Sequence, residues 1–325
     1  MTVRVREDGD VGAAAAGGKV LDAPCAAPDL SALSKLKEKN LAAEGLMILE
    51  GRIVIEKALD ARIVPRLLVC TEAEAEYWRA RLGAGAGSDP AGGLKFSVQV
   101  LPHAELCALV DFKFHRGAIA VADMPRIETL IPQDDPKRAG KARSSATPGT
   151  RCDGRSVDAP SRGADATTAR REAFYLCLWD VTDPSNLGAL VRTAAGLGAD
   201  GVLLGPGCAN PYYRKTIRAS MGNVFSIPLW NINLTGLAAL AREGTRLVAA
   251  ALTENSVPAR AFAAATGSPA PLILILGNEG YGLPDELLSV CSDQVCIPMK
   301  RGVDSLNVAV AGGILMYEML AGGTR

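Results

Sequence analysis

The sequence predicts an α/β protein with two folded domains, and three observations lead to this prediction. The chain has 325 residues, which is enough for two domains of ordinary size. Hydrophobic residues make up 48% of the composition, as in globular rather than disordered proteins. In residues 173–325, short apolar segments alternate with helical patterns. This alternation predicts a parallel sheet covered by helices.

Shifts in composition divide the chain into four segments. We predict a flexible N-terminal tail over residues 1–28, a small α/β domain over 29–125, a disordered linker over 126–172 and a larger α/β domain over 173–325. The linker has almost no large apolar side chain. It is therefore expected to stay disordered, because it cannot bury enough surface to offset the entropy lost on ordering.

The small domain is expected to combine helices with short strands. A helix comes first, a strand follows at Leu46–Glu50, and a second helix begins near Arg52. The apolar segments PRLLVC, FSVQVL and GAIAVADM are typical of three further strands. The glycine content of residues 79–93 predicts a loop.

The large domain is expected to repeat the order of strand and helix. We predict strands in AFYLCLWD, GVLLG, VFSIPLW, RLVAAAL, LILILG and QVCIPM, and helices over residues 187–197, 212–220, 234–243, 284–290 and 306–320. The last helix is too short to span a membrane. It is apolar on most sides, which favours burial against a partner subunit as well as against its own sheet.

Charge, cysteine and histidine content exclude several classes of function. Lys and Arg total 35, and so do Asp and Glu, so any contact with nucleic acid needs a local basic patch. The eight cysteines form no CxxC pair, which predicts a reducing compartment and no zinc site, with Cys177 as a buried thiol. The two histidines, His103 and His115, both lie in the small domain. Neither a histidine-based triad nor a catalytic metal is therefore expected.

The N-terminal residues do not have the pattern of a targeting signal. They lack the long apolar core of a secretory signal, and their acidic residues argue against a transit peptide. We expect a cytoplasmic protein, with an organellar location as the open alternative.

One glycine pattern has the spacing of a dinucleotide-binding fingerprint, Gly196-x-Gly198-x-x-Gly201. Such a fingerprint needs a strand before its glycines and a helix opening on them, because the helix N-terminus holds the pyrophosphate. Here a predicted helix precedes the glycines and a predicted strand follows them. We therefore expect a left-handed helix cap at this place, and a nicotinamide-dependent dehydrogenase is disfavoured.

Polar clusters follow three strands of the large domain, where open α/β sheets bind ligands. The first contains Asn186, Gly188 and Arg192. We expect Asn186 at the cap of the helix, with Arg192 pointing back over the same end from the second turn. A capping asparagine with a surface arginine is the alternative interpretation.

The second and third clusters lie far along the chain. In GNEGYGL, Glu279 stands among glycines that let the backbone approach a ligand, although an ordinary glycine-rich turn is the alternative. In the third cluster, Ser305-Leu306-Asn307 opens the last helix. A helix cap is the alternative interpretation of Ser305, whereas Asn307, within the first turn, is less easily explained by capping.

These clusters, in this order and spacing, resemble the SpoU (TrmH-type) branch of the SPOUT RNA methyltransferases. NLGALVR is similar to the NxGxxxR motif of that family, GNEGYGL to its GxExxGL motif and IPMKRGVDSLNVAVA to its IP…SLN motif. RASMGNVFSIPL resembles the stretch between the first two motifs. The resemblance covers residues 174–320. The small domain is more loosely similar to the ribosomal L30-like domain that often precedes this catalytic domain.

The resemblance implies a fold, a cofactor and an assembly. The fold would contain a deep trefoil knot near its C-terminal end, an exception to the rule that chains avoid knots. The knot would bind S-adenosylmethionine, and the chain would form a homodimer with each active site completed near the interface. The implied cofactor contacts are Leu276, Gly277, Glu279, Ile297, Met299, Ser305 and Leu306.

The implied reaction is methyl transfer to a ribose 2′-hydroxyl of RNA. The implied catalytic residues are Arg192, Asn186, Glu279, Asn307 and Ser305. Because arginine resists losing its proton, we expect Arg192 to bind the adjacent phosphate and to stabilise charge on the 2′-oxygen rather than to act as a base. Asn186 and Asn307 are expected to orient the substrate and the arginine, with Glu279 holding Arg192.

RNA contacts are expected from basic residues near aromatic ones. Arg214, Lys215 and Arg218 follow two tyrosines, a combination that suits phosphates and stacked bases, and a solvated helix face is the alternative. Lys300 stands where the family often has a glycine and is expected to bind phosphate. Ribosomal RNA is favoured as the substrate because the L30-like domain often accompanies that choice. The alternatives are transfer RNA, transfer to a base, and a catalytically silent RNA-binding or assembly factor.

Overall fold

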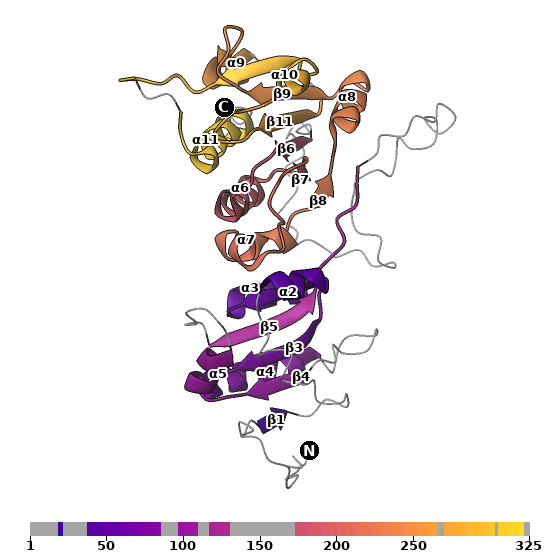
Figure 1. The fold of residues 1–325 in the computed structure, drawn as a ribbon, viewed down its shortest axis with the longest axis vertical. Coiled ribbons are helices and arrows are strands. Elements are labelled where there is room, and N and C mark those ends of the chain that lie inside the picture. Colours follow the sequence, from indigo (N-terminus) through magenta and orange to yellow (C-terminus); the bar gives the residue numbers. More distant parts are fainter. Residues whose placement is uncertain are drawn as a thin grey trace, which may run out of the picture. The chain divides into compact units, whose positions relative to one another are not determined.

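The chain forms two compact units, which we call unit 1 and unit 2 (Figure 1). The computed structural model describes residues 19–21, 38–85, 97–109, 117–130, 173–265, 270–302 and 305–321. Unit 1 comprises Met1–Arg126 and Asn210–Ser226, and unit 2 comprises Ile127–Ala209 and Ile227–Arg325. The sequence assigned Asn210–Ser226 to the large domain, whereas in the structure this segment is part of unit 1.

Unit 1 is built on a five-stranded sheet with the order β1-β4-β3-β5-β2. Its strands are β1 (Lys19–Leu21), β2 (Leu46–Glu50), β3 (Pro65–Cys70), β4 (Ser97–Val100) and β5 (Ala118–Asp123). Its helices are α2 (Glu38–Ala43), α3 (Arg52–Asp60), α4 (Glu72–Gly85), α5 (His103–Leu109) and α7 (Arg214–Ala219), with a 3-10 turn, η1 (Asn223–Phe225). Only β3 and β4 pair in parallel, and the other pairs are antiparallel.

Two segments of unit 1 differ from the sequence prediction. The predicted flexible tail contains β1, which pairs with β4 and so satisfies the backbone groups of that edge strand; the other residues of the tail lie outside the described ranges. The predicted loop at 79–93 begins too early, because α4 continues to Gly85. Acidic residues in the first turn of α4 and the fully buried Trp78 on it favour helix over the glycine signal.

Unit 2 is built on a seven-stranded sheet with the order β10-β12-β9-β11-β6-β7-β8, and all of its pairs are parallel. Its strands are β6 (Phe174–Leu178), β7 (Gly201–Leu204), β8 (Leu229–Asn231), β9 (Arg246–Ala250), β10 (Val257–Pro258), β11 (Leu272–Leu276) and β12 (Asp293–Cys296). The helices are α6 (Pro184–Leu197), α8 (Leu234–Arg242), α9 (Ala259–Ala265), α10 (Asp285–Leu288) and α11 (Val308–Ala321). The predicted α/β fold with a parallel sheet is confirmed.

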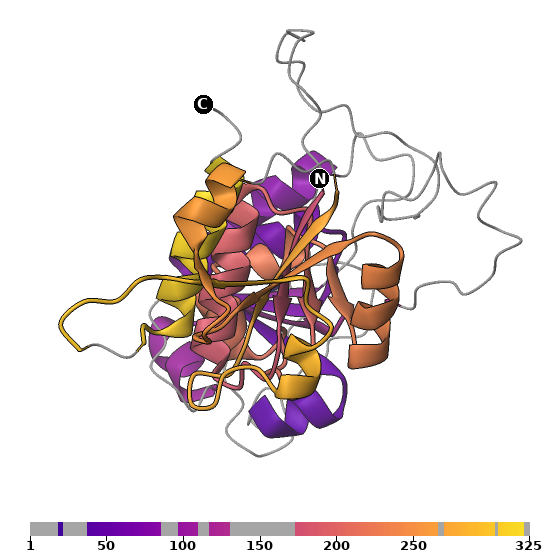
Figure 2. The same ribbon diagram turned by 90° about the horizontal axis from the view of Figure 1, so that it is seen from above.

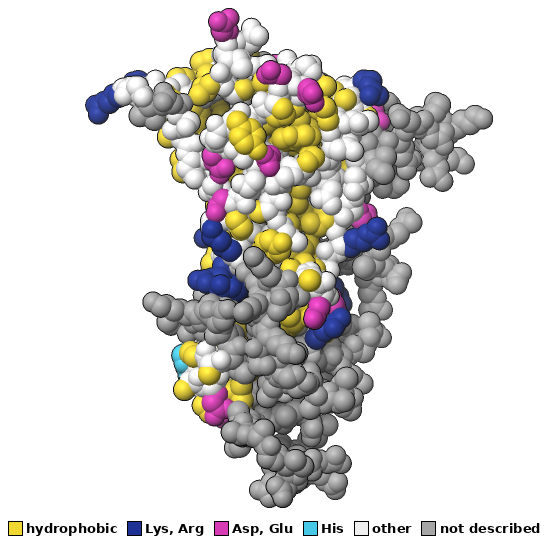
Figure 3. Space-filling view, in the orientation of Figure 1, with side chains coloured by type: hydrophobic (Ala, Val, Ile, Leu, Met, Phe, Trp, Pro, Cys, Tyr) yellow, Lys and Arg dark blue, Asp and Glu magenta, His cyan; other side chains and the backbone are white. Residues whose placement is uncertain are grey.

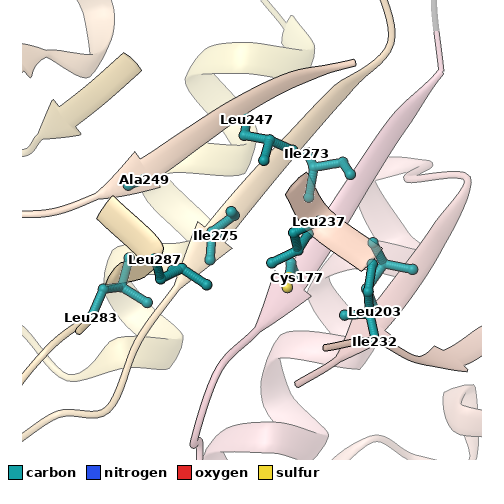
Figure 4. Close-up of a cluster of buried hydrophobic side chains, with 10 residues drawn as sticks. All are labelled: Cys177, Leu203, Ile232, Leu237, Leu247, Ala249, Ile273, Ile275, Leu283 and Leu287. Carbon is teal, nitrogen blue, oxygen red and sulfur yellow. The ribbon is translucent and has the colours of Figure 1, made fainter. Parts of the chain in front are cut away.

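Helices cover both faces of this sheet (Figure 2). On one face, Leu237 of α8 and Leu287 of α10 pack on strand side chains such as Cys177 and Ile275 (Figure 4). On the other face, α6 and α11 lie side by side. The contact is close, because a Cβ atom on Gly312 of α11 would collide with side chains of α6 and β11.

Local differences from the prediction also occur in unit 2. The strand expected in VFSIPLW is confined to Leu229–Asn231, because Asn223–Phe225 forms η1 in unit 1. Residues 127–130, which the sequence placed in the disordered linker, lie along β8, where the Asn231 N–H donates to the Glu128 carbonyl at 2.8 Å. Residues 131–172 lie outside the described ranges. No helix in the described part of the chain has the length and hydropathy to cross a membrane.

The glycine pattern after α6 is a helix end, as predicted. Gly198 is the C-cap residue of α6 with φ 80° and ψ 35°, a left-handed conformation that glycine adopts without strain. Strand β7 then begins at Gly201. The spacing of these glycines therefore comes from a turn between helix and strand.

Candidate functional site

The candidate site lies at the carboxyl ends of β6 and β11, which are neighbours although their last residues, Leu178 and Leu276, are 98 positions apart in sequence. Leu178 and Leu276 are register partners in the parallel ladder. Strand β11 sits between β6 and β9, although it follows both of them in sequence. The chain therefore changes direction within the sheet at this point, where open α/β sheets bind ligands. The loops that follow the two strands bring the first and second polar clusters together.

The loop after β6 begins helix α6 with a cap that the sequence analysis missed. The Asp183 carboxylate accepts hydrogen bonds from the Ser185 N–H at 2.7 Å and the Asn186 N–H at 3.0 Å. The prediction that Asn186 caps this helix is therefore wrong. Aspartate is favoured at this position because its negative charge also interacts with the helix dipole. The amide side chain of Asn186 is left for other contacts.

The loop after β11 is held by its own backbone. A Cβ atom on Gly277 would lie 2.5 Å from the Gly282 carbonyl oxygen, so this position requires glycine. The Asn278 amide donates to the Asp180 carbonyl at 3.0 Å and accepts from the Gly280 N–H at 2.8 Å. These contacts fix the loop and present the Glu279 side chain to solvent.

Three side chains from the three predicted clusters form one hydrogen-bond network. The Asn186 amide donates to the Glu279 carboxylate. The Asn307 amide donates to Asn186 Oδ1 at 3.0 Å. Each cluster follows a different strand, so the network forms only when the sheet is assembled. The predicted grouping of Asn186, Glu279 and Asn307 is therefore found in the structure.

Asn307 also caps the last helix. Its Oδ1 atom accepts from the Ala309 N–H at 3.0 Å and from the Val310 N–H at 3.4 Å. The expectation that Asn307 is not a cap is therefore wrong, and so is the alternative interpretation of Ser305 as the cap, because α11 begins at Val308 and the cap residue is the one directly before it. One asparagine thus both starts the helix and binds Asn186.

A cavity of about 460 Å³ opens beside this network. Its volume lies in the range of roughly 300–1,000 Å³ that is typical of small-molecule sites. All residues predicted to contact a cofactor line it: Leu276, Gly277, Glu279, Ile297, Met299, Ser305 and Leu306. The cavity is also lined by residues that the sequence analysis missed, among them Leu252, Thr253 and Tyr281. Leu252 and Thr253 could have been found, because they too follow the carboxyl end of a strand, β9.

Arg192 does not join the network within its own chain. Its side chain is exposed and does not line the cavity. A helix turns by about 100° per residue, so six residues rotate a side chain by about 600°, which leaves it about 120° from its starting direction. Arg192 and Asn186 therefore point from different sides of α6. The expected pair of Glu279 and Arg192 is not formed in the described part of the chain, and Glu279 accepts from Asn186 instead.

The basic residues predicted to bind RNA lie in two places. In unit 1, Arg214 and Arg218 of α7 both pair with Glu50, at 3.2 and 3.5 Å, and Glu50 is only 2% exposed. Lys215 is exposed beside them. Lys300 is exposed in unit 2, next to the cavity residue Met299. On the face drawn in Figure 3, Lys and Arg side chains stand in separate groups rather than in one continuous patch.

Three cysteines of unit 2, Cys177, Cys208 and Cys291, lie wholly or partly in the protein interior. Burial raises the pKa of the Cys291 thiol to about 11 and also raises the pKa values of Cys177 and Cys208. These thiols are therefore protonated near neutral pH, which disfavours them as nucleophiles. In the described residues, no three His, Cys, Asp or Glu side chains form a group able to hold a metal ion.

Comparison with known proteins gives one consistent result. Residues 173–317 match the family model described as the SpoU rRNA Methylase family. The chain is 31% identical over 285 residues to an uncharacterized tRNA/rRNA methyltransferase of Mycobacterium bovis, covering 86% of this chain and 82% of that one. It is 37% identical over 153 residues to the 23S rRNA (guanosine(2553)-2′-O)-methyltransferase of Bacillus subtilis, covering 47% of this chain and 58% of that one.

A solved structure agrees with the sequence matches. The AdoMet-bound rRNA methyltransferase of Sinorhizobium meliloti is 26% identical, with a TM-score of 0.63, covering 90% of this chain and 92% of that one. The motifs, the parallel sheet and the long match to the mycobacterial relative lead to the same assignment. The chain belongs to the SpoU family of RNA methyltransferases, as its three motifs predicted.

Proposed function

We propose that this protein transfers a methyl group from S-adenosylmethionine to a ribose 2′-hydroxyl of ribosomal RNA. The observation that carries the proposal is the cavity beside the Asn186–Glu279–Asn307 network, lined by every residue expected to contact this cofactor. Ribosomal RNA is favoured because the relatives from B. subtilis and S. meliloti are named as rRNA methyltransferases. Transfer RNA is the alternative, since the mycobacterial relative is named for both.

The cavity fits S-adenosylmethionine in its chemistry as well as its size. Apolar side chains such as Leu276, Ile297 and Leu306 suit the flat adenine ring. Gly277 lines the cavity and lets the loop fold back to Gly282, which a side chain at this position would prevent. The Glu279 carboxylate lines the same cavity and favours a positively charged ligand. When bound, the cofactor supplies a methyl group on an electrophilic sulfonium.

The protein's own residues position the nucleophile. Glu279 and Asn307 hold both ends of the Asn186 amide, so the direction in which Asn186 can contact a substrate is set before binding. Arg192 offers five N–H donors and no acceptor, so it binds phosphate and stabilises negative charge developing on the 2′-oxygen. Ser305 lies in the cavity wall, where its hydroxyl would be available to hydrogen-bond a bound cofactor.

A homodimer completes the site in this proposal. Val310, Ile314 and Tyr317 of α11 are 53%, 39% and 61% exposed and share one face of the helix by their spacing. Such an exposed apolar stripe is typical of a subunit interface. Helix α6, which carries Arg192, packs against α11. Because Arg192 lies outside the cavity of its own chain, it would serve the cavity of the partner subunit.

The role of the dimer can be tested by mixing two inactive variants. R192A keeps the cavity and loses the arginine, whereas G277A displaces the loop that lines the cavity and keeps the arginine. If Arg192 acts across the interface, random mixing restores about a quarter of wild-type turnover, since half the dimers are mixed and each has one intact site. No recovery in mixed dimers, verified by co-purification of two tags, would place Arg192 at its own chain's cavity.

Three finer features complete the proposal. The strand order in which β11 lies between β9 and β6 supports a trefoil knot formed by the loops that line the cavity. Unit 1 would act as the L30-like domain that grips RNA. The exposed part of Arg218, with Lys215 and Lys300, would bind phosphates, while Arg214 mainly holds Glu50.

Mapping of 2′-O-methyl groups in RNA tests the function directly. Ribosomal and transfer RNA from cells with and without the gene are compared, and purified protein with tritiated S-adenosylmethionine must restore the missing group. Loss of one site in ribosomal RNA is expected. Loss in transfer RNA would select the alternative substrate. No loss at any site, together with calorimetric failure to bind S-adenosylmethionine, would leave a catalytically silent RNA-binding factor.

A further inference from the structure

Tyr281 is an exposed aromatic residue at the mouth of the cavity. It lines the cavity, yet it is 71% exposed, more than any other large hydrophobic residue in the described part of the chain. Its position follows Glu279 by two residues, so the ring lies in the same loop as the carboxylate that holds Asn186. The ring therefore borders both the cavity and solvent.

The loop that carries Tyr281 is rigid. Asn278 and Gly282 form a backbone bridge around it, with the Gly282 N–H donating to the Asn278 carbonyl at 2.9 Å. The Gly280 N–H donates to the Asn278 side chain at 2.8 Å, and Gly282 has a φ of 71° that favours glycine. The exposure of the ring is therefore a property of a fixed loop. A ligand that packs on it loses little entropy in ordering the protein.

We propose that Tyr281 stacks on an unpaired base of the RNA substrate, next to the ribose that is methylated. The inference rests on the proposed function, since it names the contact by which the substrate is held. Exposed aromatic rings bind single-stranded RNA by stacking, and every base offers a face for this contact. Tyr281 is 71% exposed, so the ring is accessible to a base from solvent. Tyr281 is a substrate-binding residue that also sets the distance of the ribose from the cavity.

Three substitutions at this position separate stacking from other roles. Y281A removes the ring, Y281L keeps apolar volume without a flat face, and Y281F keeps the ring and removes the hydroxyl. The substrate is ribosomal RNA from cells that lack the gene, with tritiated S-adenosylmethionine as the donor. Y281A and Y281L are expected to raise the KM for RNA by roughly 5- to 150-fold, the range of one lost stacking contact. Y281F is expected to stay within about twofold of wild type, because it retains the ring face.

Two controls decide between this contact and its competitors. Calorimetry with S-adenosylmethionine is expected to give an unchanged Kd for all three variants, and gel filtration an unchanged oligomeric state. A weaker cofactor Kd in Y281A would instead assign the ring to the cofactor, and a shift to monomer would assign it to a partner subunit. Either result overturns the inference, as does an unchanged KM in Y281A.

Failure of the inference is distinguishable from failure of the proposed function. If wild-type protein transfers tritium to ribosomal RNA and Y281A does so with the same KM, only the proposed role of Tyr281 is refuted. If wild-type protein transfers nothing to this RNA, the proposed function falls and the inference falls with it.

Discussion

The two units use their polar side chains in different ways. In unit 1, charged groups pair with one another: Glu50 lies between Arg214 and Arg218, and Arg52 binds Glu74 through two hydrogen bonds of 3.0 and 2.7 Å. In unit 2, the polar groups of the three motifs converge on a cavity. The first arrangement holds the protein together, and the second is prepared for a ligand.

Sheet topology explains this difference. In unit 1, β1 and β5 run opposite to β2, β3 and β4, so the loops that follow its strands are divided between the two edges of the sheet. All strands of unit 2 run in parallel, so every loop after a strand emerges at the same edge. The three polar clusters follow three of these strands, and their side chains meet at that edge.

The largest effect is expected from breaking the paired charges of unit 1. The double variant R214A/R218A leaves the buried Glu50 carboxylate without either arginine, which is expected to lower the free energy of unfolding by about 3–5 kcal/mol. Urea denaturation followed by circular dichroism measures the change. R66A is the matched control: the Arg66–Asp123 pair has both side chains more than 60% exposed, and its loss is expected to cost at most about 1 kcal/mol. If the double variant unfolds at the same urea concentration as the wild type but binds RNA more weakly, the two arginines bind RNA rather than stabilise the fold.

The next effect concerns the cavity of unit 2. In G277A the added methyl would lie 2.5 Å from the Gly282 carbonyl, so the loop must move. Affinity for S-adenosylmethionine is expected to fall at least about tenfold, or roughly 1.4 kcal/mol, by calorimetry. G196A is the control, because a Cβ atom there meets nothing within 4 Å and alanine favours helix. Equal affinities in the two variants would mean that the loop does not need its present shape.

Substitution of Asn307 tests whether one residue both caps α11 and holds Asn186 in the site. N307A removes the cap of α11 and the donor to Asn186, and should destabilise the protein by about 1 kcal/mol while slowing methyl transfer. N307D keeps an oxygen for the cap but loses the donor, so it should slow transfer at nearly wild-type stability. Thermal unfolding and tritium transfer separate the two effects. Equal stability of the two variants would refute the capping role.

The smallest effect comes from a paired charge in unit 2, away from the cavity. Arg246 donates to Asp293 at 2.7 and 2.8 Å, and this hydrogen bonding holds the pKa of Asp293 below its ordinary value of 3.8. Because the pKa of Asp293 is lower in the folded than in the unfolded state, the ionised carboxylate stabilises the fold above pH 3.8. This stabilisation is lost as the pH falls through the pKa of the folded state. D293N should therefore cost about 0.2–1 kcal/mol at pH 7, as for other partly exposed pairs. The difference from wild type should shrink at pH 3, and a constant difference would contradict the assignment.

Much of unit 2 could be predicted because each of its signals is local. Buried parallel strands appear as continuous apolar runs, so β6 and β11 were found within a residue or two. The site residues could be predicted because each polar cluster directly follows such a run. Their mutual contacts could not, since Asn186 and Asn307 are 121 residues apart and meet only through the order of strands in the sheet.

The errors share one physical cause, which is competition between equally plausible local partners. Aspartate, serine and asparagine are all favoured as helix caps, so Asp183, Ser305 and Asn307 are equally plausible from the sequence. Which residue caps its helix depends on where the preceding strand ends and where the helix begins. Arg214 and Arg218 have the pattern of a basic helix face. Only the fold shows that both arginines pair with Glu50. Glu50 is the last residue of the apolar strand β2, and the burial of its charged side chain indicates that it has a partner.

The membership of Asn210–Ser226 in unit 1 limits how this protein can be divided. The polypeptide passes between the units after Arg126, after Ala209 and after Ser226, so no single cut separates them. A fragment beginning at residue 173 would keep the fully buried Ile217 but lose the surface of β2 and α3 against which α7 and η1 pack. It would also lose Lys57, which donates to Asn223 at 2.6 Å. The methyltransferase domain of this chain should therefore be expressed together with unit 1, because a fragment without it would expose the surface of α7 and η1.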